Sequence, residues 1–236
     1  GEDGTLWGGE VLLASPSEYE RVCHFKELTL LGGEKAIKEP RRVGLALLFE
    51  CFELDKILEM DSALARSFSK QEIKTFYAMF ARGASSPKSS SIGRLFDGVF
   101  ALSGYVEKLG YEGESGLIME SLSKFSNALE SYSYTIQNGV IDWRDMVCEI
   151  LEEEDASEIS LKFINTISKI IVDVSAKYPG LPVILSGGVF QNATLVAKTS
   201  QAFAKEKRRY YVQEKTPVND GGISLGQAYF ALHNKG

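Results

Sequence analysis

Two adjacent glycines, Gly187 and Gly188, separate an apolar run at 183–185 from a helical pattern expected over about 190–205. Because glycine has no Cβ, backbone N–H groups at such a turn can come close to a phosphate, and the start of a helix adds partial positive charge. The pattern predicts a phosphate-binding turn. A tight turn that uses glycine only for its positive φ is the alternative interpretation.

A second glycine pair, Gly221 and Gly222, follows Asp220 at the start of a helix expected over about 222–233. Asp220 alone is equally consistent with a helix cap. The preceding strand is expected at 210–212, so both glycine turns come at the carboxyl ends of neighbouring strands. Open α/β sheets bind nucleotides in the crevice at such strand ends. Together the two turns predict a nucleotide-binding cleft.

A third group of candidate residues comes from the helical middle of the chain: Arg94, Asp97, Glu112 and Gly113. Carboxylates beside glycines can accept hydrogen bonds from ribose hydroxyls, and an arginine can hold phosphate oxygens with two N–H groups. The alternatives are structural. Arg94 and Asp97 have the i,i+3 spacing of a surface ion pair, and Glu112-Gly113 has the composition of a turn before a helix.

These groups must be positioned by a helix-rich α/β chain. Short extended segments are predicted at 11–13 and 21–25, and strands at 183–185 and 210–212. The run at 183–185 is wholly apolar, as in a strand buried on both faces. Residues 83–91, rich in glycine and serine, predict a loop that cannot bury enough surface to become ordered. The helices before residue 180 are expected at about 40–54, 70–81, 92–108, 114–129, 142–153 and 157–177.

Composition excludes several classes of function. The 236 residues are 44% hydrophobic, which is typical of a globular chain. Lys and Arg number 26 against 32 Asp and Glu, giving a net charge of −6, so we expect no nucleic-acid partner and no anionic lipid surface. No apolar run reaches the roughly 18 residues of a membrane span, and we expect a cytoplasmic protein with no membrane partner.

The metal-binding side chains are few and widely spaced. The three cysteines, Cys23, Cys51 and Cys148, form neither a disulfide framework nor a zinc-cluster pattern, and they suit a reducing cytosol. The two histidines, His24 and His233, stand at opposite ends of the chain. A zinc cage built from this chain alone is therefore not expected, since such cages usually include close ligand pairs.

Six blocks in order along the chain resemble the C-terminal part of the HypF family of hydrogenase-maturation carbamoyltransferases. They lie at 3–10, 31–40, 93–97, 111–113, 186–192 and 219–228. The resemblance implies that residues 1–236 are the C-terminal part of a threonylcarbamoyl-transferase-like domain, without the upstream domains. It further implies an actin/Hsp70/sugar-kinase-like (ASKHA) nucleotide-binding α/β fold, helix-rich and with only part of its first lobe.

In this family, ATP and carbamoyl phosphate give carbamoyl adenylate at an upstream domain. The domain that this chain resembles then passes the carbamoyl group to the C-terminal cysteine of a partner protein, HypE, for synthesis of the cyanide ligand of [NiFe]-hydrogenase. The resemblance thus implies an enzyme, with ATP, carbamoyl phosphate and HypE as its partners. It leaves the catalytic residues unassigned.

Site residues carried over from the resemblance are the following. Gly187, Gly188 and Asn192 line the nucleotide phosphates, and Asp97, Glu112 and Gly113 lie near the ribose. The residue patterns themselves add Gly221, Gly222 and Arg94 as further expected nucleotide contacts. Asp220 corresponds to the family's C-terminal ligand of a divalent metal, either Zn, Fe or Mg.

The family's histidine-rich metal motif has no counterpart in this chain. We therefore expect the isolated chain to bind metal poorly and not to complete the reaction. Two alternatives stay open: a tRNA threonylcarbamoyl-transfer relative, and a non-catalytic module that only docks HypE.

Overall fold

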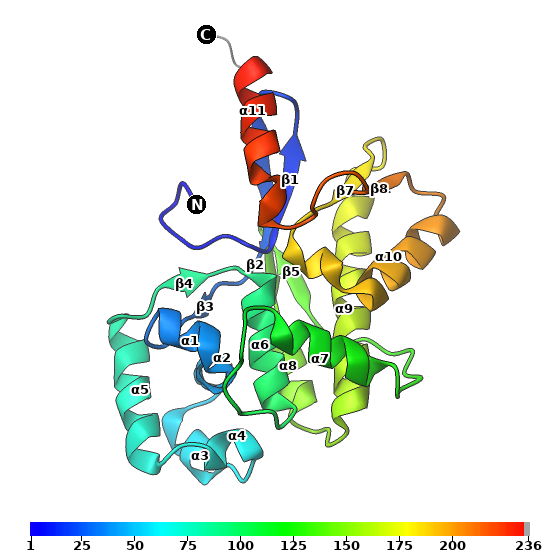
Figure 1. The fold of residues 1–236 in the computed structure, drawn as a ribbon. Helices are drawn as coiled ribbons and strands as arrows, with labels where there is room; N and C mark the ends of the chain where they lie inside the picture. Colours follow the sequence, from blue (N-terminus) through cyan, green and yellow to red (C-terminus); the bar gives the residue numbers. More distant parts are fainter. Residues whose placement is uncertain (234–236) are drawn as a thin grey trace.

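The computed structural model describes residues 1–233, which form a helical body with three small sheets at its upper side (Figure 1). The strands are β1 (Glu10–Ala14), β2 (Tyr19–Phe25), β3 (Leu28–Thr29), β4 (Lys88–Ser89), β5 (Thr135–Gln137), β6 (Val140–Asp142), β7 (Val183–Leu185) and β8 (Tyr210–Val212). The α-helices are α1 (Glu34–Lys38), α2 (Pro40–Cys51), α3 (Leu54–Glu59), α4 (Ala63–Arg66), α5 (Lys70–Arg82), α6 (Ile92–Leu102), α7 (Glu114–Ser123), α8 (Arg144–Ile150), α9 (Ala156–Ala176), α10 (Ala193–Lys205) and α11 (Ile223–His233). Two short 3₁₀ turns, η1 (Gly188–Gln191) and η2 (Asp220–Gly222), precede α10 and α11.

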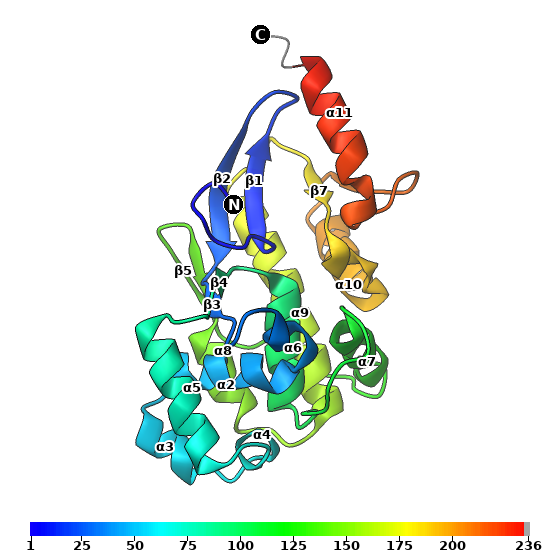
Figure 2. The ribbon, with the colours of Figure 1, turned by 60° about the vertical axis from the view of Figure 1, so that its left-hand side comes forward.

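The sheets are small and mostly antiparallel. The largest has the strand order β1-β2-β6-β5, in which only β2 and β6 run parallel. A second sheet joins β3 to β4, and a third pairs β7 with β8 in parallel. The β1–β2 hairpin and α11 extend from the same end of the molecule (Figure 2). The helical body therefore holds most of the core.

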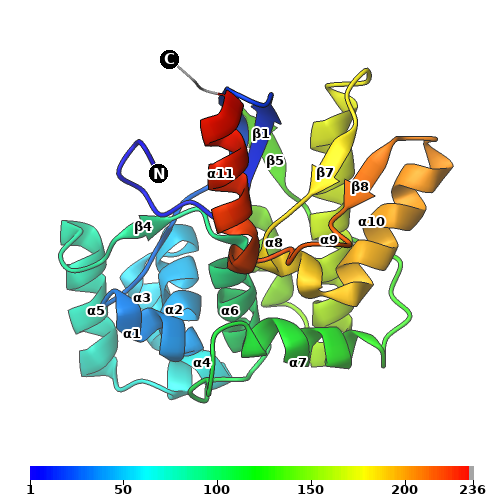
Figure 3. The ribbon, with the colours of Figure 1, turned by 45° about the horizontal axis from the view of Figure 1, so that its top comes forward.

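The helix α9 packs against both α7 and α10 (Figures 1 and 3). Its start is capped by the Asp155 carboxylate, which accepts from the Ser157 N–H at 2.8 Å. Its apolar side chains at helical spacing, among them Ile159, Phe163 and Ile167, are buried. The expected helix at 157–177 is confirmed, and its apolar face is core.

Helices α2 and α6 cross at close range because two glycines meet there. A Cβ at Gly98 would lie 2.4 Å from Leu47 Cδ1, and a Cβ at Gly44 would lie 3.3 Å from the Gly98 carbonyl oxygen. The absence of these side chains lets the two backbones approach each other. This crossing fixes the N-terminal turn of α6, which carries Arg94.

The segment 83–91 is better ordered than its composition predicts. It contains β4, and Ser86, Ser89 and Ser90 are buried. The Ser89 hydroxyl donates to the Leu6 carbonyl at 2.9 Å, and the Ser90 hydroxyl donates to the Glu10 carboxylate. The prediction of a segment unable to order itself was wrong because the N-terminal chain supplies partners for the serine hydroxyls.

The strand β7 is present as expected, but it is not buried on both faces. Leu185 packs against the helices, whereas the Ile184 side chain is 67% exposed. Tyr211 on the neighbouring strand β8 is exposed on the same outward face. The prediction was wrong because β7 and β8 form a two-stranded sheet covered by helices on one side only.

Several helix boundaries also differ from the expectations. The helix predicted at 92–108 ends at Leu102, and the one predicted at 114–129 ends at Ser123. The helix predicted from 142 begins at Arg144 because residues 140–142 form β6. None of the helices within residues 1–233 is long and apolar enough to span a bilayer.

Candidate functional site

A cavity of about 820 Å³ opens between the helical body and the β7–β8 layer. Its wall is built from segments far apart in the sequence: the N-terminal segment, the first turn of α6, the start of α7, and the turns after β7 and β8. The lining residues are Trp7, Gly8, Ser91, Ile92, Gly93, Arg94, Phe96, Tyr111, Glu112, Gly113, Ser115, Gly116, Leu117, Glu120, Ser186, Gly187, Gly188, Val189, Gln191, Asn192, Asn219, Asp220 and Gly221.

The first glycine turn leads directly into the N-terminus of α10. Gly187 has φ 106°, a conformation that requires glycine, and η1 carries the chain from Gly188 to Gln191. A Cβ at Gly188 would meet no atom within 4 Å, so the backbone there is open to the cavity. The turn can therefore present N–H groups and the positive end of α10 to an anion.

Asn192 joins this turn to the helix. Its side-chain Oδ1 accepts from the Leu195 N–H at 2.9 Å and so caps α10. The residue is 7% exposed, and its Nδ2 has no hydrogen-bond partner within the described chain. A buried amide N–H₂ without a partner is costly. Because Asn192 lines the cavity, its amide is available to a ligand with an acceptor oxygen.

The second glycine turn lies against the first. The Gly187 N–H donates to the Val218 carbonyl at 2.8 Å, which ties the two turns together. Both turns border the same cavity through Gly187, Gly188 and Gly221. The geometry that the sequence predicted for two neighbouring parallel strands is therefore present.

Asp220 is not the capping side chain of the second turn. Asn219 takes that role, since its Oδ1 accepts from the Gly221 N–H at 3.1 Å. Asp220 lines the cavity instead. Gly222 is not among the lining residues, and a Cβ there would lie 2.8 Å from the Pro217 carbonyl oxygen. The backbone path thus explains Gly222 without a ligand.

Arg94 and Asp97 form an ion pair, but it is buried rather than on the surface. Arg94 Nη1 lies 2.9 Å from Asp97 Oδ2, and both side chains are almost fully buried. The Ser115 hydroxyl donates to Asp97 Oδ1 at 2.5 Å. Burial raises the pKa of Asp97 to about 6, while Arg94 and the Ser115 hydrogen bond act in the opposite direction.

This arrangement changes the place of Asp97 in the site. Asp97 does not line the cavity; it lies behind the wall and holds Arg94, which does. Arg94 in turn donates from Nη2 to Glu112 Oε1 at 3.0 Å. The Glu112 side chain is 73% exposed. Of the two expected carboxylates, only Glu112 is available at the cavity surface.

Gly113 follows Glu112 and begins α7. It has φ 87° and is the N-cap of that helix, so this position also favours glycine. The expected turn before a helix is confirmed here. Both Glu112 and Gly113 line the cavity, as do the two glycine turns.

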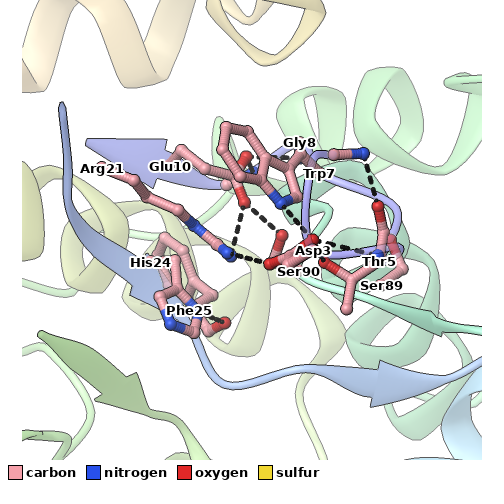
Figure 4. Close-up of polar contacts among 12 residues, drawn as sticks. Asp3, Thr5, Trp7, Gly8, Glu10, Arg21, His24, Phe25, Ser89 and Ser90 are labelled. Carbon is pink, nitrogen blue, oxygen red and sulfur yellow. Dashed lines mark hydrogen bonds and ion pairs between the residues drawn. The ribbon is translucent and has the colours of Figure 1, made fainter. Parts of the chain in front are cut away.

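Trp7 and Gly8 add a wall that analysis of the sequence did not assign to the site. Arg21 holds this segment, with Nη1 2.5 Å from Asp3 Oδ2 and its guanidinium carbon 4.4 Å from the Trp7 ring centroid (Figure 4). The Glu10 carboxylate accepts from the Gly8 N–H at 2.5 Å. The block 3–10 contained these residues, but their spacing alone gives no indication of a cavity.

A complete metal site is not present in the described chain. No group of three or more His, Cys, Asp or Glu side chains within residues 1–233 is arranged to hold a metal ion. Asp220 is the acidic residue of the second turn at the cavity and offers one carboxylate. One carboxylate does not make a binding site for a divalent metal, so the described residues do not fit one.

Comparison with protein families identifies this architecture. The family described as "Carbamoyltransferase, Kae1-like Domain, second subdomain" matches residues 1–227. The chain belongs to this family. Its fold is accordingly that of a Kae1-like carbamoyltransferase domain, in agreement with the expected helix-rich α/β class.

Relatives of this Kae1-like second subdomain are carbamoyltransferases named HypF. The protein "Carbamoyltransferase HypF" of Synechocystis sp. is 31% identical over 245 residues, which cover 96% of this chain and 32% of that protein. The HypF of Rhizobium leguminosarum bv. viciae is 29% identical over 240 residues, covering 98% of this chain and 30% of that protein. The chain thus spans about a third of the length of these relatives.

Solved HypF structures share the fold. Full-length HypF in a phosphate- and nucleotide-bound form matches with a TM-score of 0.85 and 32% identity, covering 98% of this chain and 37% of that one. The HypF of T. kodakarensis matches with a TM-score of 0.83 and 22% identity, covering 98% of this chain and 32% of that one. The second match supports the fold of the Kae1-like second subdomain alone.

Proposed function

We propose that this chain forms a nucleotide-binding cleft in a carbamoyltransferase of the HypF type, with an ASKHA-like fold. The observation that carries the proposal is the meeting of the two glycine turns, joined by the hydrogen bond from Gly187 N–H to Val218, at one cavity. The nucleotide-bound form of a related HypF supports a nucleotide as the ligand.

Different residues of the cavity wall contact different parts of the nucleotide in this proposal. Gly187, Gly188 and Gly221 offer backbone near the phosphates, where the start of α10 adds partial positive charge. The unpartnered Asn192 amide supplies a further donor to an acceptor oxygen. On the opposite wall, Glu112 can accept hydrogen bonds from ribose hydroxyls, and Gly113 allows the ribose to approach.

Arg94 and Asp97 support that wall rather than contact the nucleotide independently. The Arg94 guanidinium is already engaged by Asp97 and Glu112, so it holds the Glu112 carboxylate at the cavity. Ser115 completes this support by its hydrogen bond to Asp97. Gly222 shapes the second turn and needs no direct contact with the ligand.

In the proposed reaction, the cleft holds carbamoyl adenylate, which is made from carbamoyl phosphate and ATP. The carbamoyl carbon is attacked by the C-terminal cysteine thiolate of HypE, and AMP leaves. Holding the two reactants together in a closed cleft lowers the entropic part of the barrier. Asp220 would contribute one ligand to a divalent metal in the larger protein, and the remaining ligands would come from elsewhere.

Nucleotide binding is tested with a Gly188→Val substitution. A Cβ at Gly188 meets nothing in the protein, so the added side chain fits the fold but occupies the space proposed for the phosphates. We expect calorimetric titration with ATP to give a Kd at least about tenfold weaker for the variant than for the unchanged chain, a difference of about 1.4 kcal/mol.

The matched control is Gly180→Ala, because Gly180 also has free space around its Cα and does not line the cavity. It should bind ATP as the unchanged chain does. Equal affinity of Gly188→Val and the unchanged chain would show that ATP does not bind at the glycine turns.

A docking module without catalysis is the second candidate function, since the chain spans only about a third of its relatives. In the larger protein, Asp220→Ala separates the two. The enzyme proposal expects loss of carbamoyl transfer with HypE binding retained. A docking module would be indifferent to the substitution, with HypE binding and the transfer activity of the larger protein both unchanged.

A further inference from the structure

Two cysteines that are far apart in the sequence lie together in the helical body. Cys51 is the last residue of α2, and Cys148 lies on α8. These two helices pack against each other. Cys51 Sγ reaches the carbonyl of Arg144, one helical turn before Cys148, whereas the third cysteine, Cys23, is buried in β2.

Helix geometry explains why the two thiols meet. Cys51 Sγ donates to the Arg144 carbonyl at 3.8 Å, so the thiol lies over the first turn of α8. Cys148 follows Arg144 by four residues on the same helix, which places its side chain on the same face. Because a helical Cβ leans toward the N-terminus, the Cys148 thiol points back toward that turn.

The two thiols differ in their access to solvent. Cys148 is exposed, and Cys51 is partly buried. Burial, together with the neighbouring Cys148, raises the pKa of the Cys51 thiol to about 12. The exposed thiol is therefore the one that a reagent in solution reaches first, and the partly buried thiol is placed to act on the product.

We propose that Cys51 and Cys148 form a dithiol oxidation site that reacts with small-molecule disulfides to give an intramolecular disulfide. The Cys148 thiolate attacks one sulfur of glutathione disulfide, the S–S bond breaks, and one glutathione leaves as a thiolate. Cys51 then loses its proton to solvent and attacks the Cys148 sulfur. The second glutathione leaves, so two protein thiols are oxidised while one disulfide is reduced to two thiols.

The site would link two helices that support the cavity. Both α2 and α8 pack on α6, whose first turn carries the cavity residue Arg94. A covalent bond between α2 and α8 closes a long loop of chain and restricts the unfolded state. The oxidised chain should therefore have a higher Tm than the reduced chain.

The experiment treats the reduced chain with excess glutathione disulfide at pH 8, blocks the remaining thiols, and measures intact mass and a non-reducing peptide map. The expected product has lost two hydrogens, carries no glutathione, and links the peptides that contain residues 51 and 148. The Cys51→Ser chain should stop with one glutathione on Cys148. The Cys148→Ser chain should form no internal disulfide and show no rise in Tm.

Cys148→Ser is an exposed and conservative change, so it tests the proposal even if Cys51→Ser fails to fold. A stable glutathione adduct on Cys148 in the unchanged chain, with no link to Cys51, would overturn the proposal. So would an internal disulfide that involves Cys23, which is buried in β2.

Discussion

The helical body and the upper rim of this chain bury their apolar side chains to very different extents. In the body, one continuous cluster joins the apolar faces of α2, α6, α8 and α9, and side chains such as Phe163 are fully buried. In the rim, which we define as the β1–β2 hairpin, the outer face of β7–β8 and α11, Leu12, Ile184 and Tyr211 are exposed. Similar residue types therefore have different energetic roles in the two regions.

The helix α11 shows the contrast most clearly. It has no buried residue, and its large apolar side chains, including Leu225, Tyr229 and Phe230, are exposed. It extends away from the body, and its most extensive contacts are with η2 (Figures 1 and 2). An isolated helix of this length is marginal in water. Contacts within residues 1–233 therefore stabilise the body far more than α11.

The largest expected effect is a loss of stability in the body. Phe163 is fully buried, and its ring meets Phe96 edge-on at 4.7 Å between centroids. A Phe163→Ala substitution removes this packing and leaves a cavity, so we expect the free energy of unfolding to fall by about 3–5 kcal/mol. Urea unfolding followed by circular dichroism measures it. A loss below about 1 kcal/mol would contradict the packing described for α9.

A smaller effect is expected from the buried carboxyl of Asp97. Its pKa is raised from 3.8 to about 6 on folding, so the folded state holds the proton more tightly between these values. The stability from this group is fully present below about pH 4 and is lost as the pH rises through about 6. We expect a fall of roughly 1–3 kcal/mol across this window.

The Asp97→Asn variant isolates this titration. When it is compared with the unchanged chain, the contributions of all other titratable groups to the pH dependence of stability cancel. Urea unfolding at pH 4, 5, 6 and 7 should show the unchanged chain losing stability relative to the variant as the pH rises. A Ser115→Ala chain should extend the loss to higher pH, because it lacks the hydrogen bond that favours the charged form and its Asp97 pKa is raised further. A constant difference over this pH range would show that Asp97 does not titrate there.

Prediction from the sequence worked best where a pattern had one local interpretation. The amphipathic run of α9 predicted its helix to within one residue at each end. Its apolar residues recur at helical spacing, and the helix face that carries them is buried against the rest of the chain. The glycine turns after β7 and β8 were also located by local rules, because Gly187 needs a positive φ. Their meeting at one cavity followed from the parallel pairing of the two strands.

Most of the failures came from partners that are distant in the sequence. The β5–β6 hairpin was missed, although Asn138-Gly139, both with positive φ, is a typical turn pair for two-residue hairpins. The order of 83–91 depends on hydrogen bonds to Leu6 and Glu10, about 80 residues away. The burial of Asp97 depends on Ser115 from another helix. No local pattern contains the contacts of residues 83–91 or of Asp97.

The smallest effect is expected in α11. The Phe230 side chain is 45% exposed, so Phe230→Ser removes little packing within this chain, and we expect the free energy of unfolding to change by less than about 0.5 kcal/mol. Hydrogen exchange should agree, with the amides of α11 exchanging faster than those of α9. A loss above about 1 kcal/mol would mean that α11 folds back onto the chain in solution. The rim would then contribute to the free energy of unfolding as the body does, because an apolar side chain stabilises the fold only when other groups of the protein bury it.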